Sequence, residues 1–104
     1  MKKMEKELSG KVLIDFLHEN KEFLSKEFGV FEIALFGSWA RNRQKPGSDL
    51  DLLVKLRPEC KTFDNYMNLK FYLEDYLQIK VDLVLKDSIR PELKKAILAE
   101  AVHA

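Results

Sequence analysis

Three short apolar segments, separated by helix-like patterns, constrain the fold of this 104-residue chain more than any other feature. They cover Val30–Phe36, Asp49–Leu56 and Ile79–Leu85, and their length, apolar composition and flanking turn residues predict buried strands. Strands that alternate with helices favour a small mixed sheet covered by helices, an α/β (α+β) fold. The chain length predicts a single domain over residues 1–104, with residues 1–8 frayed.

The helices are predicted from apolar residues that recur at helical spacing. The first is expected to run unbroken from Lys11 to Phe28 and to stop at Gly29. The second is expected to begin after Thr62 as its N-cap and to end near Gln78. A last helix is expected to open at Asp87 or Ser88, with these apolar residues toward the core: Leu93, Ile97, Leu98 and Ala101. The expected order is α-β-(short α)-β-α-β-α.

Composition limits the classes of partner. The net charge of +1 provides no general field for holding a polyanion, so long nucleic acid is not expected as the main partner. No apolar run approaches the roughly 18 to 20 residues that a membrane-spanning helix needs, so no membrane association is expected. The single Cys60 has no nearby cysteine or histidine at metal-ligand spacing, which fits a reducing cytoplasm.

Acidic residues occupy an unusual position on two of the predicted strands. If a strand begins at Asp49, the side chains of Asp49 and Asp51 project from the same face, and Asp82 lies on the next predicted strand between two apolar residues. Neighbouring carboxylates repel each other and aspartate is depleted in strands, so a compensating divalent cation is expected. Alone, an Asp-x-Asp pair is more often a solvated strand edge.

A Gly37-Ser38 pair follows the first predicted strand and precedes Asp49 by a ten-residue gap. Glycine permits close approach of a phosphate to the backbone N–H groups, and Ser38 is expected to cap a short helix through Arg41. Taken alone, such a pair is more often a simple turn with a cap. Together with the three aspartates, however, it forms a pattern that packing alone does not require.

This combination predicts nucleotidyl transfer. In that chemistry two Mg²⁺ ions held by Asp49, Asp51 and Asp82 would neutralise the triphosphate, and Asp82 would also help to remove the proton from the attacking hydroxyl. Arg41 is the favoured basic residue for the triphosphate, ahead of Arg43 and Lys45. Ser48 could hydrogen-bond either its own loop or a phosphate. Other residues are expected to be structural or surface residues: Trp39, Cys60, His18 and His103.

These residues carry a family resemblance. Gly37-Ser38, the ten-residue gap, Asp49-Leu50-Asp51 and Val81-Asp82-Leu83 resemble the signature of the DNA polymerase beta-type nucleotidyltransferase superfamily. The short length and the tail from Ile89 to Val102 resemble the minimal nucleotidyltransferases within it. Two positions depart from the pattern: Asn42 stands where such proteins often have glycine, and His103-Ala104 where they often have a tyrosine. Asparagine tolerates left-handed backbone, so the turn at Asn42 is expected to survive.

The resemblance implies an ATP-dependent enzyme that requires Mg²⁺ and moves AMP onto a tyrosine of a cognate HEPN-domain ribonuclease toxin, thereby acting as its antitoxin. Two alternatives remain. The chain could neutralise a partner by binding alone, or it could transfer a nucleotide to a small molecule or an RNA end. The second predicted helix also carries more apolar residues than one core stripe needs, including Met67, Phe71 and Tyr72, and this surplus predicts a surface for a partner protein.

Overall fold

The computed structural model describes residues 8–104, so the predicted fraying of the N-terminus lies outside the described residues except at Leu8. Four strands form one sheet in the order β3-β2-β1-β4. They are β1 (Val30–Phe36), β2 (Leu50–Leu56), β3 (Val81–Leu85) and β4 (Val102–His103). β1 pairs antiparallel with β2 and with β4, whereas β2 and β3 are parallel. The predicted mixed sheet is confirmed, but β4 was not predicted, because two residues carry no detectable strand pattern.

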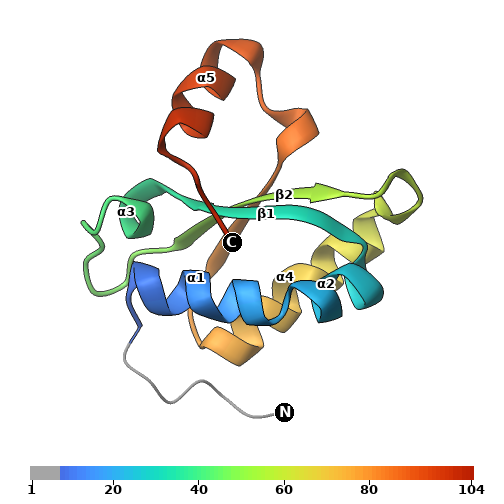
Figure 1. Ribbon diagram of the computed structural model, residues 1–104, viewed down its shortest axis with the longest axis horizontal. Coiled ribbons are helices and arrows are strands. Elements are labelled where there is room, and N and C mark those ends of the chain that lie inside the picture. The colour runs from blue at the N-terminus through green and yellow to red at the C-terminus, as the bar shows by residue number, and fades with distance from the viewer. Residues whose placement is uncertain (1–7) are drawn as a thin grey trace.

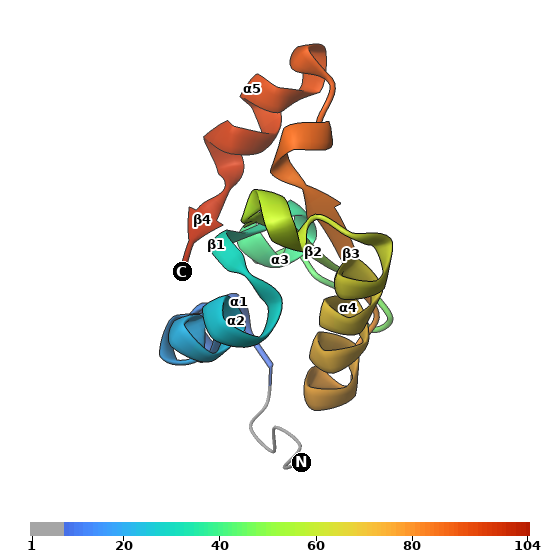
Figure 2. The same cartoon turned by 90° about the vertical axis from the view of Figure 1, so that its right-hand side faces the viewer.

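The helices are distributed unequally over the two faces of the sheet. α1 (Gly10–Glu19), α2 (Lys21–Phe28) and α4 (Phe63–Leu77) cover one face, while α5 (Pro91–Glu100) rises from the other (Figures 1 and 2). Leucines of α1, α2 and α4 pack with the inward-facing residues of the strands to form the core. Within residues 8–104, no helix is long and apolar enough to cross a membrane.

The prediction of one unbroken helix from Lys11 to Phe28 was wrong, because the helix is interrupted at Asn20. Asn20 leaves helical geometry at φ −102° and ψ 9°, and its side-chain Nδ2 donates a hydrogen bond to the Phe16 carbonyl oxygen at 2.8 Å. An asparagine amide that satisfies a helix carbonyl competes with the regular backbone pattern. The second segment ends as predicted, at Gly29 in left-handed conformation with φ +70°.

The prediction for α4 is confirmed. The Thr62 hydroxyl accepts a hydrogen bond from the Asn65 N–H at 3.1 Å, and the helix ends at Gln78, which adopts left-handed backbone. The buried residues of the helix follow its core stripe: Leu69, Leu73 and Leu77. Because α4 connects two parallel neighbours, β2 and β3, it also places Asp82 beside Asp51.

The prediction that α5 faces the core was wrong. None of its residues is buried, and Leu93 is 53% exposed. The helix begins at Pro91 after Arg90, whereas Asp87 and Ser88 belong to a separate 3-10 turn, Lys86–Ser88. The sheet face beneath α5 mixes charged residues, such as Lys55 and Asp82, with the buried Leu53, so a helix that packs on it meets a partly polar surface.

Candidate active site

The centre of the candidate site is a pair of carboxylates on adjacent parallel strands. Asp51 of β2 and Asp82 of β3 are direct register partners. Asp82 is exposed and Asp51 is half-buried, while their strand neighbours are buried on the helix-covered face: Leu50, Leu52, Val81 and Leu83. The strand alternation therefore directs both aspartates to the open face of the sheet. The strand expected from Asp49 begins one residue later, at Leu50, which leaves Asp49 exposed at the entrance to β2.

The surroundings of Asp51 disfavour its negative charge. The pKa of Asp51 is raised above its ordinary value, first by burial and then by the negative charges of Asp82 and Asp49. A hydrogen bond with Asp82 and the charge of Glu100 act in the same direction. Asp51 therefore lies among like charges, an arrangement that a bound cation would relieve.

The turn at Gly37 lies against the carboxylate of Asp51. Gly37 begins the short helix α3 (Gly37–Ala40) directly after Phe36, the register partner of Asp51. Its φ is +73°, and a Cβ added there would overlap with the Asp51 Oδ2 and come within 2.9 Å of the Asp51 Cγ. Only glycine combines this backbone angle with such close approach to a side chain. The predicted glycine turn and the predicted Asp51 thus lie in direct contact.

Ser38 does not cap α3, contrary to the prediction. Phe36 occupies the N-cap position, and no side chain makes a capping hydrogen bond. The physical reason is that the chain turns at Gly37 itself, so Ser38 already lies inside the first turn of α3. Its carbonyl oxygen accepts a hydrogen bond from the Arg43 N–H at 2.8 Å. The turn expected at Asn42 is confirmed by its left-handed φ of +56°.

Glu100 lies in the tail that resembles the minimal nucleotidyltransferases, but no role in the site was predicted for it. Its Oε1 accepts a hydrogen bond from the Gly37 N–H at 2.9 Å, and its Oε2 pairs with the Arg41 Nη1 at 3.3 Å. These partners are 63 and 59 residues away in the sequence. No local motif could have revealed the contact, because it depends on how α5 returns toward α3. Arg41 therefore lies close to the predicted glycine turn, but its guanidinium is paired with the carboxylate of Glu100.

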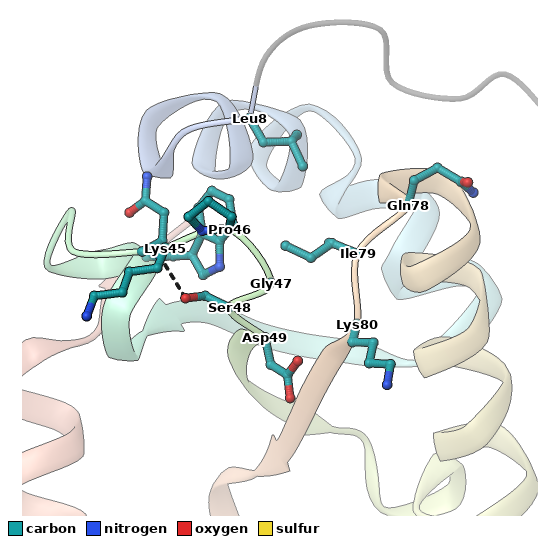
Figure 3. A pocket seen from close by; sticks show the side chains of 11 residues that line it. Leu8, Lys45, Pro46, Gly47, Ser48, Asp49, Gln78, Ile79 and Lys80 are labelled. Atoms are coloured by element: carbon teal, nitrogen blue, oxygen red, sulfur yellow. Dashed lines mark hydrogen bonds between the residues drawn. The ribbon is translucent and has the colours of Figure 1, made fainter.

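Ser48 makes a hydrogen bond within its own loop, one of the two predicted alternatives. Its hydroxyl accepts from the Lys45 N–H at 2.8 Å, the dashed line in Figure 3. A cavity of about 770 Å³ lies between loop 44–49 and residues 78–80. Asp49 lies on the wall of this cavity, but Gly37, Asp51 and Asp82 do not, so the cavity and the carboxylate pair are neighbouring features rather than one site.

One of the residues predicted to be structural lies close to this region. Trp39 is 7% exposed and packs in the core, with its Nε1 lacking a hydrogen-bond partner within the described part of the chain.

Across residues 8–104, no three His, Cys, Asp or Glu side chains already form a metal site. The donor set at Asp51 and Asp82 nevertheless consists of carboxylate oxygens, the ligands that Mg²⁺ prefers.

The chain resembles known proteins over most of its length. The family model described as nucleotidyltransferase domain matches residues 17–103. The sequence is 39% identical over 87 residues to the protein adenylyltransferase MntA of Thermococcus cleftensis, which covers 84% of this chain and 87% of that protein. A solved structure with a provisional assignment as a minimal nucleotidyltransferase superimposes with a TM-score of 0.78 at 29% identity, over 93% of this chain and 97% of that chain.

A third similarity concerns the fold alone. The complex of a tri-AMPylated HEPN toxin with its MNT antitoxin, from Shewanella oneidensis, contains a chain that matches with a TM-score of 0.57 and 21% identity. The match covers 90% of this chain and 66% of that chain. The match therefore shows that the two chains have a similar fold.

Proposed function

Because the chain belongs to the nucleotidyltransferase domain family, we propose that it transfers AMP from ATP to a protein hydroxyl, specifically a tyrosine of a cognate HEPN-family toxin. The observation that carries this proposal is the in-register pair Asp51 and Asp82, of which Asp51 lies in contact with the glycine turn at Gly37. The name of the Thermococcus relative, a protein adenylyltransferase, supports a protein acceptor.

The carboxylates are proposed to hold Mg²⁺. Asp51 and Asp82 are register partners and Asp49 lies close enough to raise the pKa of Asp51, so all three can offer oxygen ligands to the same region. Two Mg²⁺ ions bound there would neutralise the triphosphate and align the attacking oxygen. Asp82, the most exposed member of the pair, is proposed to accept the proton of the attacking hydroxyl.

The reaction itself needs no covalent intermediate on the protein. The hydroxyl oxygen forms a bond to the α-phosphorus of ATP, the bond from that phosphorus to the bridging oxygen breaks, and pyrophosphate leaves with the bonding electrons. The Gly37 and Ser38 N–H groups and the Arg41 guanidinium are proposed to bind the leaving phosphates. Ser48 is proposed to contribute a hydroxyl at the same end once ATP is bound.

The antitoxin role rests on the partners of structural relatives. The Shewanella complex pairs an MNT antitoxin with a HEPN toxin that carries AMP, and we infer the same kind of partner here. Asp82 is exposed and Asp51 is half-buried on the sheet face opposite α1, α2 and α4, and we propose that an acceptor side chain reaches them from that face. If the protein acted by binding alone, the carboxylate pair and the glycine turn would have no catalytic role. We therefore place the binding-only role second, as the alternative.

The proposal is tested by incubating the protein with Mg²⁺, extract of the source cells and ATP labelled on the α-phosphate. We expect a labelled protein band, with AMP on a tyrosine after peptide sequencing, and no label from ATP labelled on the γ-phosphate. The Asp49→Asn/Asp51→Asn double variant is the control and should yield no label. Label recovered only in a small molecule or RNA would refute the protein acceptor, and a partner retained without any label would favour the binding-only alternative.

The predicted partner surface on α4 can be tested separately. Phe71 is 55% exposed, while its neighbour Tyr72 packs against the rings of Phe23 and Phe28. We expect Phe71→Glu to weaken binding of the acceptor protein about tenfold or more, because a charge would enter an apolar contact. The matched control is Phe31→Glu, which changes another exposed aromatic residue, on β1. Titration calorimetry measures the affinity. An affinity for the acceptor protein that Phe71→Glu leaves unchanged would show that the partner surface is not on this face of α4.

A further inference from the structure

Glu100 already occupies, within the molecule, a position suited to an anion. One carboxylate oxygen accepts from the Gly37 N–H at 2.9 Å and the other pairs with Arg41 at 3.3 Å. A backbone N–H and a guanidinium are the donors that proteins use for phosphate oxygens as well as for carboxylates. The same two donors are those that the proposed function assigns to the leaving phosphates. Glu100 and the nucleotide would therefore require the same groups.

The charge of Glu100 also opposes a second anion nearby. It acts on Asp51 in the same direction as Asp82 and Asp49, so it adds to the negative charge around the carboxylate pair. A triphosphate that approached Gly37 with Glu100 in place would meet this negative charge and would find the Gly37 N–H and the Nη1 of Arg41 engaged. Both effects are removed if the Glu100 side chain leaves.

The element that carries Glu100 is weakly held. Glu100 is the last residue of α5, a helix with no buried residue. Arg90 and Ala101, which flank α5, have extended rather than helical backbone, and β4 beyond it pairs with β1 at only two positions. Figure 2 shows α5 projecting away from the layer formed by α1, α2 and α4. No residue of α5 is itself buried, although Leu53 on the sheet face that it lies over is buried, so we expect displacement of this segment to cost less than opening the core.

We propose that Glu100 is an intramolecular competitor of the nucleotide: it closes the Gly37–Arg41 anion site in the free protein, and the triphosphate displaces it and releases α5. This inference rests on the proposed function for the location of the phosphates. It makes the C-terminal segment Pro91–His103 the part of the chain that responds to ATP. Any partner bound to α5 would consequently detect whether nucleotide is present.

The test is the affinity for ATP in the presence of Mg²⁺, measured by titration calorimetry without an acceptor. We expect Glu100→Gln, which keeps the shape and removes the charge, to bind ATP about tenfold more tightly than the unmodified protein, and Glu100→Ala to bind at least as tightly. Inorganic triphosphate should show the same gain, because the competition concerns the phosphates. Glu92→Gln removes an equal charge from the exposed start of the same helix and should leave the affinity unchanged.

The direction in which Glu100→Gln changes the affinity for ATP distinguishes two roles of Glu100: competition with the nucleotide, and support of the glycine turn at Gly37. If Glu100 merely held the glycine turn in place, Glu100→Gln would bind ATP more weakly, and this result or an unchanged affinity would overturn the inference. Hydrogen exchange provides a second readout: residues 91–103 should exchange faster when ATP is added to the unmodified protein, and already without ATP in Glu100→Gln. Tighter binding without AMP transfer would refute the proposed function alone, whereas no ATP binding by any variant would refute both.

Discussion

Replacing Asp51 by asparagine is expected to lower the rate of AMP transfer at least about 10²-fold while leaving the protein folded and slightly more stable. The loss of rate follows from the removal of a charged oxygen ligand at the centre of the proposed metal site. The gain in stability follows from the surroundings of Asp51, which raise its pKa by burial and by the charges of Asp82 and Asp49. Without a cation, its ionised form is unfavourable in the folded protein.

The pH dependence of this stability has a definite sign. Because the pKa of Asp51 is raised in the folded state, its contribution is favourable below the ordinary value of 3.8 and is lost as the pH rises through the folded value. The stabilisation by Asp51→Asn should therefore appear at neutral pH and vanish below about pH 4. Since the side chain remains partly in water, we expect less than about 1 kcal/mol, a rise of a few degrees in Tm at most.

Thermal unfolding at several pH values, with and without Mg²⁺, measures this effect. Mg²⁺ should raise the Tm of the unmodified protein and have little effect on the variant, because binding to the folded state alone stabilises it. Asp15→Asn, a change at an exposed aspartate of α1, is the matched control and should alter neither the rate nor the response to Mg²⁺. A variant less stable than the original at neutral pH would show that Asp51 has a favourable partner in the folded protein.

Replacing Gly37 by alanine is expected to abolish activity and to reduce the free energy of unfolding by about 2 to 4 kcal/mol. Two physical effects add at this position. The backbone angle of +73° is unfavourable for any residue with a Cβ, and that Cβ would overlap with the carboxylate of Asp51. Rotation of the carboxylate cannot remove the contact completely, because the Cβ of Asp51 itself lies 3.1 Å away.

Gly47→Ala separates the two effects. Gly47 has a similarly positive φ of +87°, but an added Cβ there has no atom within 4 Å. This variant should lose only about 1 to 2 kcal/mol, the cost of the backbone angle. Denaturant unfolding of both variants gives the difference, which reports the overlap with Asp51. Equal losses at the two positions would mean that strand β2 shifts to accommodate the new methyl group at Gly37.

Local sequence patterns predicted much of the fold. The apolar segments at Val30–Phe36, Asp49–Leu56 and Ile79–Leu85 contain the three longer strands, and the Thr62 cap with its leucine stripe predicted α4. These features depend on residues close together in the sequence, where turn chemistry and periodicity act directly. For the same reason the order of strands and helices, and the projection of Asp51 and Asp82 from one face of the sheet, could be inferred without coordinates.

The sequence by itself therefore determined which chemical groups are available and on which elements they lie. Only the tertiary structure decided how distant groups meet: the side-by-side register of Asp51 and Asp82, the contact of Gly37 with Asp51, and the occupation of the Gly37 N–H by Glu100. It also decided that α5 lies over the sheet face that carries Asp51 and Asp82, with none of its own residues buried. The physical reason is that strand pairing and ion pairs between distant residues depend on the complete packing, which no local spacing encodes.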